Sequence, residues 1–178
     1  MSQDKSKSLT GHERQMRPDQ IIVTKTDLSG KIRYGNRTFF EFSDYGHDEC
    51  IGKQHNVIRH PEMPRTVFKL LWDTIAAGNE IFAYVNNRSK NGDSYWVLAH
   101  VTPSRDTAGN IIGYHSNRRA PNRGVLDAHI VPLYQRLLQA EQSASSPKVA
   151  LEDGAKVVES LLRERSMGFN QFMFSLGV

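Results

Sequence analysis

Five short runs of the chain alternate apolar and polar residues or gather β-branched and aromatic ones, and each run predicts a β-strand. The runs are residues 21–26, 31–34, 81–88, 95–102 and 111–119. Turn sequences rich in Asp, Asn and Gly join the first two strands and the last three, at residues 27–30, 91–93 and 106–110. Strands that follow one another through such short turns pair antiparallel.

The stretch between the second and third strands predicts helices. Asn36 precedes the apolar segment 38–42 and is well placed to cap a short helix there. Over residues 64–77, apolar side chains recur at spacings of three and four, which predicts one longer helix with Pro64 in its first turn. This order of elements indicates an α+β fold: a five-stranded antiparallel sheet with short helices on one face, followed by C-terminal helices.

The composition of the 178 residues is that of an ordinary globular protein. The formal net charge of +4 is too small and too dispersed to predict binding to nucleic acid. A local cluster of Arg118, Arg119 and Arg123 suits a phosphate or an acidic partner. The single cysteine, Cys50, excludes an internal disulfide, and no apolar stretch reaches the roughly 20 residues of a membrane span. We therefore expect a cytoplasmic protein without a membrane span.

Several groups of residues stand at the spacing of a known family. They are Asn36, residues 56–64 with the string Arg59-His60-Pro61, the helical pair Phe68 and Trp72, the hairpin 87–97, and residues 132–134. In this order they resemble a PAS sensor domain, and more narrowly the flavin-binding PAS domain of bacterial aerotaxis receptors. The resemblance covers about residues 18–138.

The resemblance implies a function. It implies FAD, held noncovalently between sheet and helices, whose redox state reports oxygen or energy supply in aerotaxis. It implies these cofactor-binding residues: Asn36, Arg59, His60, Glu62, Phe68, Trp72, Asn87 and Trp96. Relatives often carry Asp where Glu62 stands. The partner implied is a separate receptor of the methyl-accepting chemotaxis type or another signalling protein, and we also expect a homodimer. We expect no catalytic residue and no metal ligand.

The same comparison divides the chain into five parts. We expect a flexible leader at 1–17, the PAS sensor domain at 18–122, a flanking helix at 123–142, a linker at 143–149, and a C-terminal amphipathic helical segment at 150–178. The last segment carries Phe169, Phe172, Met173 and Leu176 at helical spacing. Such a stripe packs on its own sheet or contacts a partner.

Asn87 is informative on physical grounds alone. It shares a strand face with Ala83 and Val85, so a core on that face buries an amide that needs hydrogen-bond partners. A flavin edge, with its donors and acceptors, is one such partner, and a backbone-bonded core asparagine is the plain alternative. Phe68 and Trp72 likewise suit either core packing or the wall of a planar cofactor.

Other classes of function remain as alternatives. A cofactor-free PAS docking module conflicts with polar residues on the inner strand face. A haem gas sensor needs an axial histidine, and the seven histidines show no metal-binding spacing. A light-sensing cysteinyl adduct is not expected, because Cys50 precedes Gly52 and His55 stands at the place of the reactive cysteine. No nucleophile elbow or phosphate loop predicts an enzyme. The choice of FAD over FMN rests on the resemblance.

Overall fold

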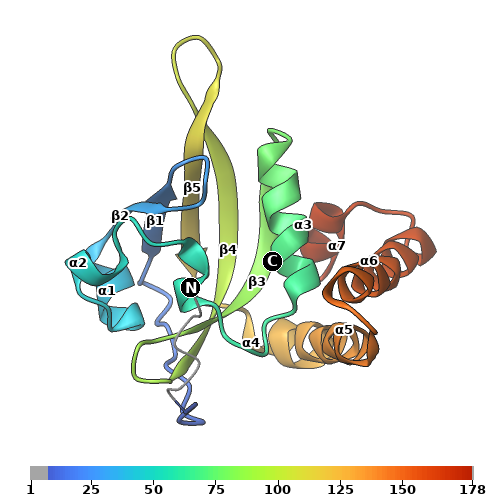
Figure 1. Ribbon diagram of the computed structural model, residues 1–178. Coiled ribbons are helices and arrows are strands. Elements are labelled where there is room, and N and C mark those ends of the chain that lie inside the picture. The colour runs from blue at the N-terminus through green and yellow to red at the C-terminus, as the bar shows by residue number, and fades with distance from the viewer. Residues whose placement is uncertain (1–7, 178) are drawn as a thin grey trace.

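The computed structural model describes residues 8–177, in which five strands form one antiparallel sheet. The strands are β1 (Ile22–Thr26), β2 (Ile32–Gly35), β3 (Ile81–Arg88), β4 (Ser94–Arg105) and β5 (Ile111–Arg119). Their order in the sheet is β2-β1-β5-β4-β3, and the long β4–β5 hairpin extends beyond the helices at the top of Figure 1. The predicted α+β architecture is confirmed.

The helices fall into two groups. The first group lies between β2 and β3 and comprises α1 (Arg37–Ser43), α2 (His47–Cys50), the short 3-10 helix η1 (His55–Ile58) and α3 (Arg65–Ala76). The second group follows β5 and comprises α4 (Arg123–Val125), the π-helical turn η2 (Leu126–Ile130), α5 (Val131–Ser143), α6 (Pro147–Glu164) and α7 (Phe169–Ser175). Figure 1 shows α5 and α6 beside the N-terminal end of α3.

The strand register defines an inner face of the sheet. Val85 pairs with Val97 and Ala83 pairs with Ala99, and residues directly opposite one another project to the same side. Ala99 in turn pairs with Arg118, so the inner face continues across β5. The predicted face of β3 is confirmed, and Asn87 on it is only 2% exposed.

The free edge of β3 is covered by polar groups from elsewhere in the chain. Asn170 on α7 accepts a hydrogen bond from the Phe82 backbone N–H at 2.9 Å and donates one to the Glu80 carbonyl at 2.9 Å. The Tyr134 hydroxyl on α5 donates to the Tyr84 carbonyl at 2.6 Å. An uncovered strand edge favours aggregation, so these contacts protect the sheet. They also attach the C-terminal helices to the domain.

The boundaries of the C-terminal parts differ from the expected ones. Helix α5 extends to Ser143, and α6 begins at Pro147, so the connection is only three residues long, 144–146. The Ser146 side chain caps α6 by accepting a hydrogen bond from the Val149 N–H at 3.3 Å. Proline in the first turn and a serine cap together begin a helix where the sequence interpretation placed a linker.

The flexible leader expected at 1–17 is wrong for the part that the structure describes, while residues 1–7 lie outside the described residues. Thr10 N–H donates to the Gly92 carbonyl at 3.2 Å, and Arg14 N–H donates to the Ser94 carbonyl at 2.8 Å. Ser94 N–H returns a bond to the His12 carbonyl at 2.9 Å. A polar composition alone did not reveal that this segment pairs with the tip of the β3–β4 hairpin.

Arg14 anchors this N-terminal segment. Its guanidinium donates from Nε to Asp93 at 2.8 Å and from Nη2 to Asp44 at 2.7 Å, and from Nη1 to the Glu41 carbonyl at 3.1 Å. Hydrogen bonds from Thr10 and Arg14 to the Asp93 carboxylate hold the pKa of Asp93 well below its usual range. One side chain thus joins the hairpin tip to the end of α1.

We expect Arg14→Ala to lower the melting temperature by about 2–6 °C, because it removes charge-assisted hydrogen bonds to two carboxylates and a carbonyl. Thermal unfolding followed by circular dichroism measures the change. Arg17→Ala is the matched control, since among residues 8–177 the Arg17 side chain pairs only with Asp19, and the two side chains are 68% and 70% exposed. Equal effects of the two substitutions would contradict the anchoring role of Arg14.

Candidate functional site

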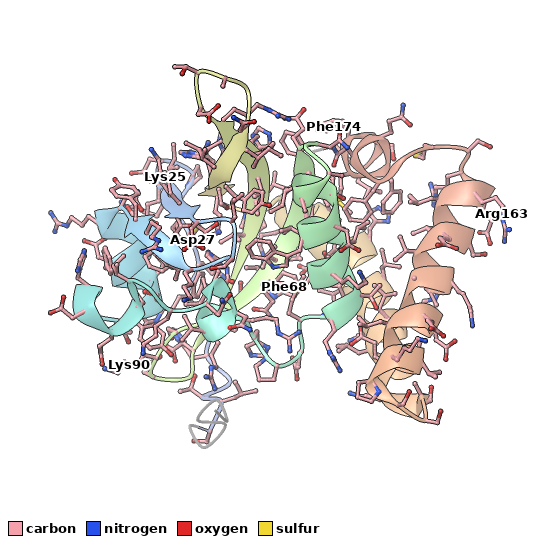
Figure 2. All side chains as sticks on the ribbon, turned by 45° about the horizontal axis from the view of Figure 1, so that its top comes forward. Lys25, Asp27, Phe68, Lys90, Arg163 and Phe174 are labelled. Carbon is pink, nitrogen blue, oxygen red and sulfur yellow. The ribbon has the colours of Figure 1, made fainter. Side chains whose placement is uncertain are left out.

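A cavity of about 40 Å³ lies between α3 and the inner face of the sheet. The apolar part of its wall comes from both sides: Phe68, Leu71, Trp72, Ile75, Val85, Ala99, Val101 and Tyr114. Phe68 is labelled in Figure 2, on α3. The polar part comes mainly from the sheet: Thr24, Thr26, His55, Asn87, Ser116 and Arg118. An apolar pocket with a few convergent polar groups is typical of a ligand site.

Four buried polar atoms of this wall have no hydrogen-bond partner among residues 8–177. They are Thr26 Oγ1, Asn87 Nδ2, Ser116 Oγ and Arg118 Nη1. Leaving buried polar atoms unpaired costs about 1–3 kcal/mol each, more where the group is charged, so native proteins rarely gather several in one place. All four can donate a hydrogen bond, and together they suit a planar ligand with several acceptor atoms.

Arg118 is the charged member of this group. Its side chain is 2% exposed, and among the described residues it forms no ion pair with a carboxylate. Its Nη2 donates to Thr24 Oγ1 at 2.7 Å and contacts His55 Nε2 at 2.5 Å. Burial lowers the pKa of Arg118 to about 10, so the guanidinium remains a cation at neutral pH. The site therefore holds a positive charge that an electron-rich ligand would offset.

The contact with Arg118 determines the state of His55. A guanidinium only donates, so the facing Nε2 must be an unprotonated acceptor and the imidazole must be neutral. Burial, followed by the charge of Arg118, holds the pKa of His55 well below its usual value. Thr24 Oγ1, which accepts from Arg118 Nη2 at 2.7 Å, lies 3.2 Å from the same Nε2. The three side chains form one polarised network.

Three of the eight predicted site residues line the cavity: Phe68, Trp72 and Asn87. The two aromatic rings come from α3, and the amide comes from β3, so the cavity brings together residues that are distant in sequence. Trp72 also packs edge-on against Tyr114, with ring centroids 5.6 Å apart. The assignment of these residues to a cofactor remains a prediction, but their shared location agrees with it.

The predicted loop of Arg59, His60 and Glu62 adjoins the cavity without lining it. Arg59 forms an isolated bridge with Asn87, and His60 N–H donates to the Asn86 carbonyl at 3.3 Å. Arg59 lies over the Phe68 ring at 5.8 Å, and His60 is 4% exposed. Glu62 is exposed and donates its backbone N–H to His60 Nδ1 at 3.2 Å. The loop thus supports the backbone beneath Asn87.

The sequence analysis predicted Asn36 as a cofactor-binding residue, but in the structure it does not line the cavity. Its Oδ1 accepts from the N–H of Phe39 and of Val23, each at 3.0 Å, and its Nδ2 donates to the Ile21 carbonyl at 2.8 Å. These bonds occupy the amide, which caps α1 as predicted and joins that helix to β1. The residue type that suits a ligand suits a helix cap equally well.

Trp96 also lies elsewhere than predicted. It is opposite Asn86 in the strand register, one position away from the residues of the inner face, so its side chain projects to the other side of the sheet. There its ring packs near Tyr134 of α5, with centroids 5.9 Å apart. The prediction followed the sequence string across the hairpin and did not apply the alternation along β4.

Sequence reasoning missed five polar residues of the wall: Thr24, Thr26, His55, Ser116 and Arg118. A signal was present for three of them. Alternation along β5 puts Tyr114, Ser116 and Arg118 on one face, and His55 stands where light-sensing relatives carry their cysteine.

The predicted cluster of Arg118, Arg119 and Arg123 is wrong, because Arg118 is buried and Arg123 pairs with Glu13 at 2.5 Å. Cys50 is buried, as expected for a packed residue.

The family model for the PAS fold matches residues 32–118, which include η1, α3 and most of the sheet. The chain contains a PAS domain. The resemblance seen in the sequence is thereby confirmed. The region that matches the model includes every residue of the cavity wall except those on β1.

The chain is similar in sequence to several characterised proteins and similar in fold to several solved structures. The aerotaxis receptor of Escherichia coli (strain K12) is 36% identical over 162 residues, which cover 89% of this chain and 31% of the receptor. Phototropin-2 of Oryza sativa subsp. japonica is 26% identical over 145 residues, 79% of this chain and 15% of that protein. The chain therefore spans less than a third of the length of these relatives.

Among solved structures, the light state of the blue-light photoreceptor Aureochrome1 LOV matches with a TM-score of 0.54 and 24% identity, covering 65% of this chain and 91% of that chain. A Light-Oxygen-Voltage domain examined with a flavin analogue matches with a TM-score of 0.56 and 16% identity, covering 69% and 89%. At such identities the likeness shows the shared fold.

Residues 8–177 contain no helix with the length and apolar character needed to cross a membrane. In the same residues, no three His, Cys, Asp or Glu side chains are grouped so as to hold a metal ion.

The neutral state of His55 predicts an acid-sensitive fold. Below about pH 6.5 the unfolded chain binds a proton on this residue that the folded protein does not, so stability falls as the pH decreases through this window. His60 adds to the trend, since burial lowers its pKa too. We expect His55→Gln to reduce the drop in melting temperature between about pH 7 and pH 5 by about half.

The control for this prediction is His47→Gln, at an exposed position on α2. It should leave the pH dependence of the melting temperature as in the parent protein. A parent-like slope in the His55 variant would show that His55 titrates alike in the folded and unfolded states.

Proposed function

We propose that this PAS domain binds FAD in the cavity between α3 and the sheet and acts as a redox or oxygen sensor in aerotaxis, and not as an enzyme. The observation that carries the proposal is the set of four unpaired polar atoms around an apolar cavity, with the buried Arg118 among them. The acceptor-rich edge of a flavin ring matches these donors, and the aromatic residues of α3 match its faces. The likeness to the aerotaxis receptor supports FAD over FMN.

The residues have distinct parts in this proposal. Asn87, Ser116 and Thr26 offer hydrogen bonds to the ring edge, and Phe68 and Trp72 cover the ring. A bound flavin takes up and releases electrons reversibly. The positive charge of Arg118 would favour a flavin that has gained negative charge on reduction, so it would raise the affinity of the site for the more anionic form of the flavin. The Arg59–Asn87 bridge carries a change at the Asn87 amide to the adjoining loop.

The cavity volume sets a condition on binding. At about 40 Å³ the cavity is far smaller than the roughly 300–1,000 Å³ of ordinary ligand pockets. The sheet side is fixed by continuous ladders of backbone hydrogen bonds, whereas α3 contacts the sheet through side chains. Entry of a flavin ring therefore requires α3 to move away from the sheet.

The wider role follows from the relatives and belongs to the same proposal. The domain acts in the cytoplasm and passes its state, through protein contacts, to a receptor of the methyl-accepting chemotaxis type, as a homodimer. A haem sensor is less well supported, because Arg118 occupies the Nε2 atom of His55, the only histidine among the described residues that line the cavity.

The absorbance spectrum of freshly purified protein tests the cofactor. We expect the two visible bands of a flavin, their loss on anaerobic reduction with dithionite, and FAD as the molecule released by denaturation. A sharp haem band would contradict the proposal. So would a colourless protein that takes up no added FAD.

Substitutions test the site. Asn87→Ala and Trp72→Ala should each lower flavin occupancy about tenfold, because each removes a contact of the ring without changing the sheet. Trp96→Phe is the matched control, since Trp96 lies on the opposite face. Occupancy is read from the ratio of visible to ultraviolet absorbance. Full occupancy in both wall variants, or equal loss in the control, would refute the assignment of the cavity.

Arg118→Met separates function from stability. We expect affinity for FAD to fall about tenfold to a hundredfold, since a charged donor is lost. The flavin-free variant should be at least as stable as the parent protein, because a buried charge without a counter-ion is replaced by an apolar side chain. Titration with FAD and thermal unfolding measure the two effects. A large loss of stability in the variant would mean that Arg118 is a structural residue.

A further inference from the structure

Helix α3, which forms one wall of the cavity, has no cap of its own. Pro64 occupies the N-cap position and makes no side-chain hydrogen bond, and the first turn of the helix contains no acidic residue. The first N–H groups of a helix have no partner within it and need acceptors from elsewhere. The local sequence of α3 does not provide them.

Glu141 of α5 provides these acceptors. Its Oε2 accepts from the Arg65 N–H at 3.1 Å, and its Oε1 accepts from both the N–H and the Oγ1 of Thr66, each at 2.8 Å. A carboxylate at a helix N-terminus also interacts favourably with the helix dipole. The cap of α3 therefore comes from a residue about 75 positions later, on the C-terminal helices.

Helix α6 contacts α3 at the same residue. Gly154 is buried, and a Cβ atom added to it would lie 1.9 Å from Thr66 Oγ1. The two helices thus approach so closely that only glycine fits at this position. Thr66, itself 5% exposed, is held by α5 through a carboxylate and by α6 through direct packing.

The same end of α3 bears on the cavity. Phe68 follows Thr66 by two residues and lines the cavity, and the Arg59 guanidinium lies over its ring. Burial, followed by the charge of Arg65, lowers the pKa of Arg59, whereas Glu141 raises it. A displacement of the first turn of α3 therefore changes the contacts of Glu141, since this carboxylate bonds to the first two residues of the helix.

We propose that Glu141 is the positioning residue that couples the cavity to the C-terminal helices: it ties α3 to α5, so movement of the cavity wall is transmitted to α5 and α6. The proposal rests on the proposed function for the ligand, FAD, but the coupling itself is a property of the protein. Figure 1 shows the arrangement, with the N-terminal end of α3 next to α5.

The test separates coupling from simple stabilisation. Glu141→Ala alone also removes the cap, so it is combined with Pro64→Ser, which supplies a local cap from within the segment. The double variant keeps α3 capped but no longer joined to α5. Hydrogen exchange of α5 and α6 is measured in the full chain after two perturbations of the cavity: addition of FAD, and Trp72→Ala in flavin-free protein.

In the parent chain we expect each perturbation to change exchange rates in α5 and α6 by about fivefold or more. In the double variant the amides of α3 stay protected, while the response of α5 falls to about a third or less; α6 keeps its direct contact with Thr66 and so retains part of its response. Glu164→Ala is the control, because among residues 8–177 the Glu164 side chain accepts only from Ser160 of its own helix. It should respond as the parent does. Glu141→Gln, which keeps one acceptor, should respond in between.

A full response in the double variant would overturn the coupling role of Glu141, and so would a parent chain in which neither perturbation reaches α5 and α6. Failure of the proposed function has a different signature, since the absorbance spectrum then shows that no FAD binds. In that case the Trp72→Ala comparison decides the coupling by itself.

Discussion

The buried guanidinium of Arg118 is the constraint around which the cavity is organised. A cation enclosed by an apolar sheet face needs acceptors, and here it finds one hydroxyl and one imidazole in place of a carboxylate. His55 must therefore stay neutral, and the Thr24 hydroxyl accepts from the guanidinium. Arg118 Nη1 and three further unpaired donors belong to residues that line the cavity. A purely structural core would have no reason to gather donors in this way.

The two walls of the cavity differ in how firmly they are held. The sheet wall is built from paired backbone groups, which resist displacement. The α3 wall depends on side-chain packing and on a carboxylate from a later helix. A site between a rigid wall and a movable one can change volume without unfolding, and the movable wall is the one in contact with the C-terminal helices. In the proposed function, this asymmetry would set both the location of the ligand and the direction of the response.

Periodicity in the sequence predicted the sheet, α3, and the inward position of Asn87, because alternation and helical spacing are local properties. It failed where a role depends on distant partners. Asn36 was assigned to a ligand, yet its amide is used by α1 and β1. Trp96 was assigned by its neighbourhood in the string, although register places it on the outer face. Arg118 was grouped with Arg119 and Arg123 as a charged cluster, although alternation along β5 places it on the same face as Tyr114 and Ser116. The cap that Glu141 gives to α3 joins residues 75 positions apart, which no spacing rule detects.

The N-terminal segment has a consequence for how the polypeptide acquires its structure. Thr10 and Arg14 find their partner, Asp93, 83 and 79 residues further along. During synthesis these contacts cannot form until the β3–β4 hairpin has left the ribosome, and contacts of such long range form late in folding in general. Thr10 and Arg14 are thus made early but reach their partner late. Until then the tip of the hairpin lacks both the Arg14 guanidinium and the backbone hydrogen bonds to the N-terminal segment.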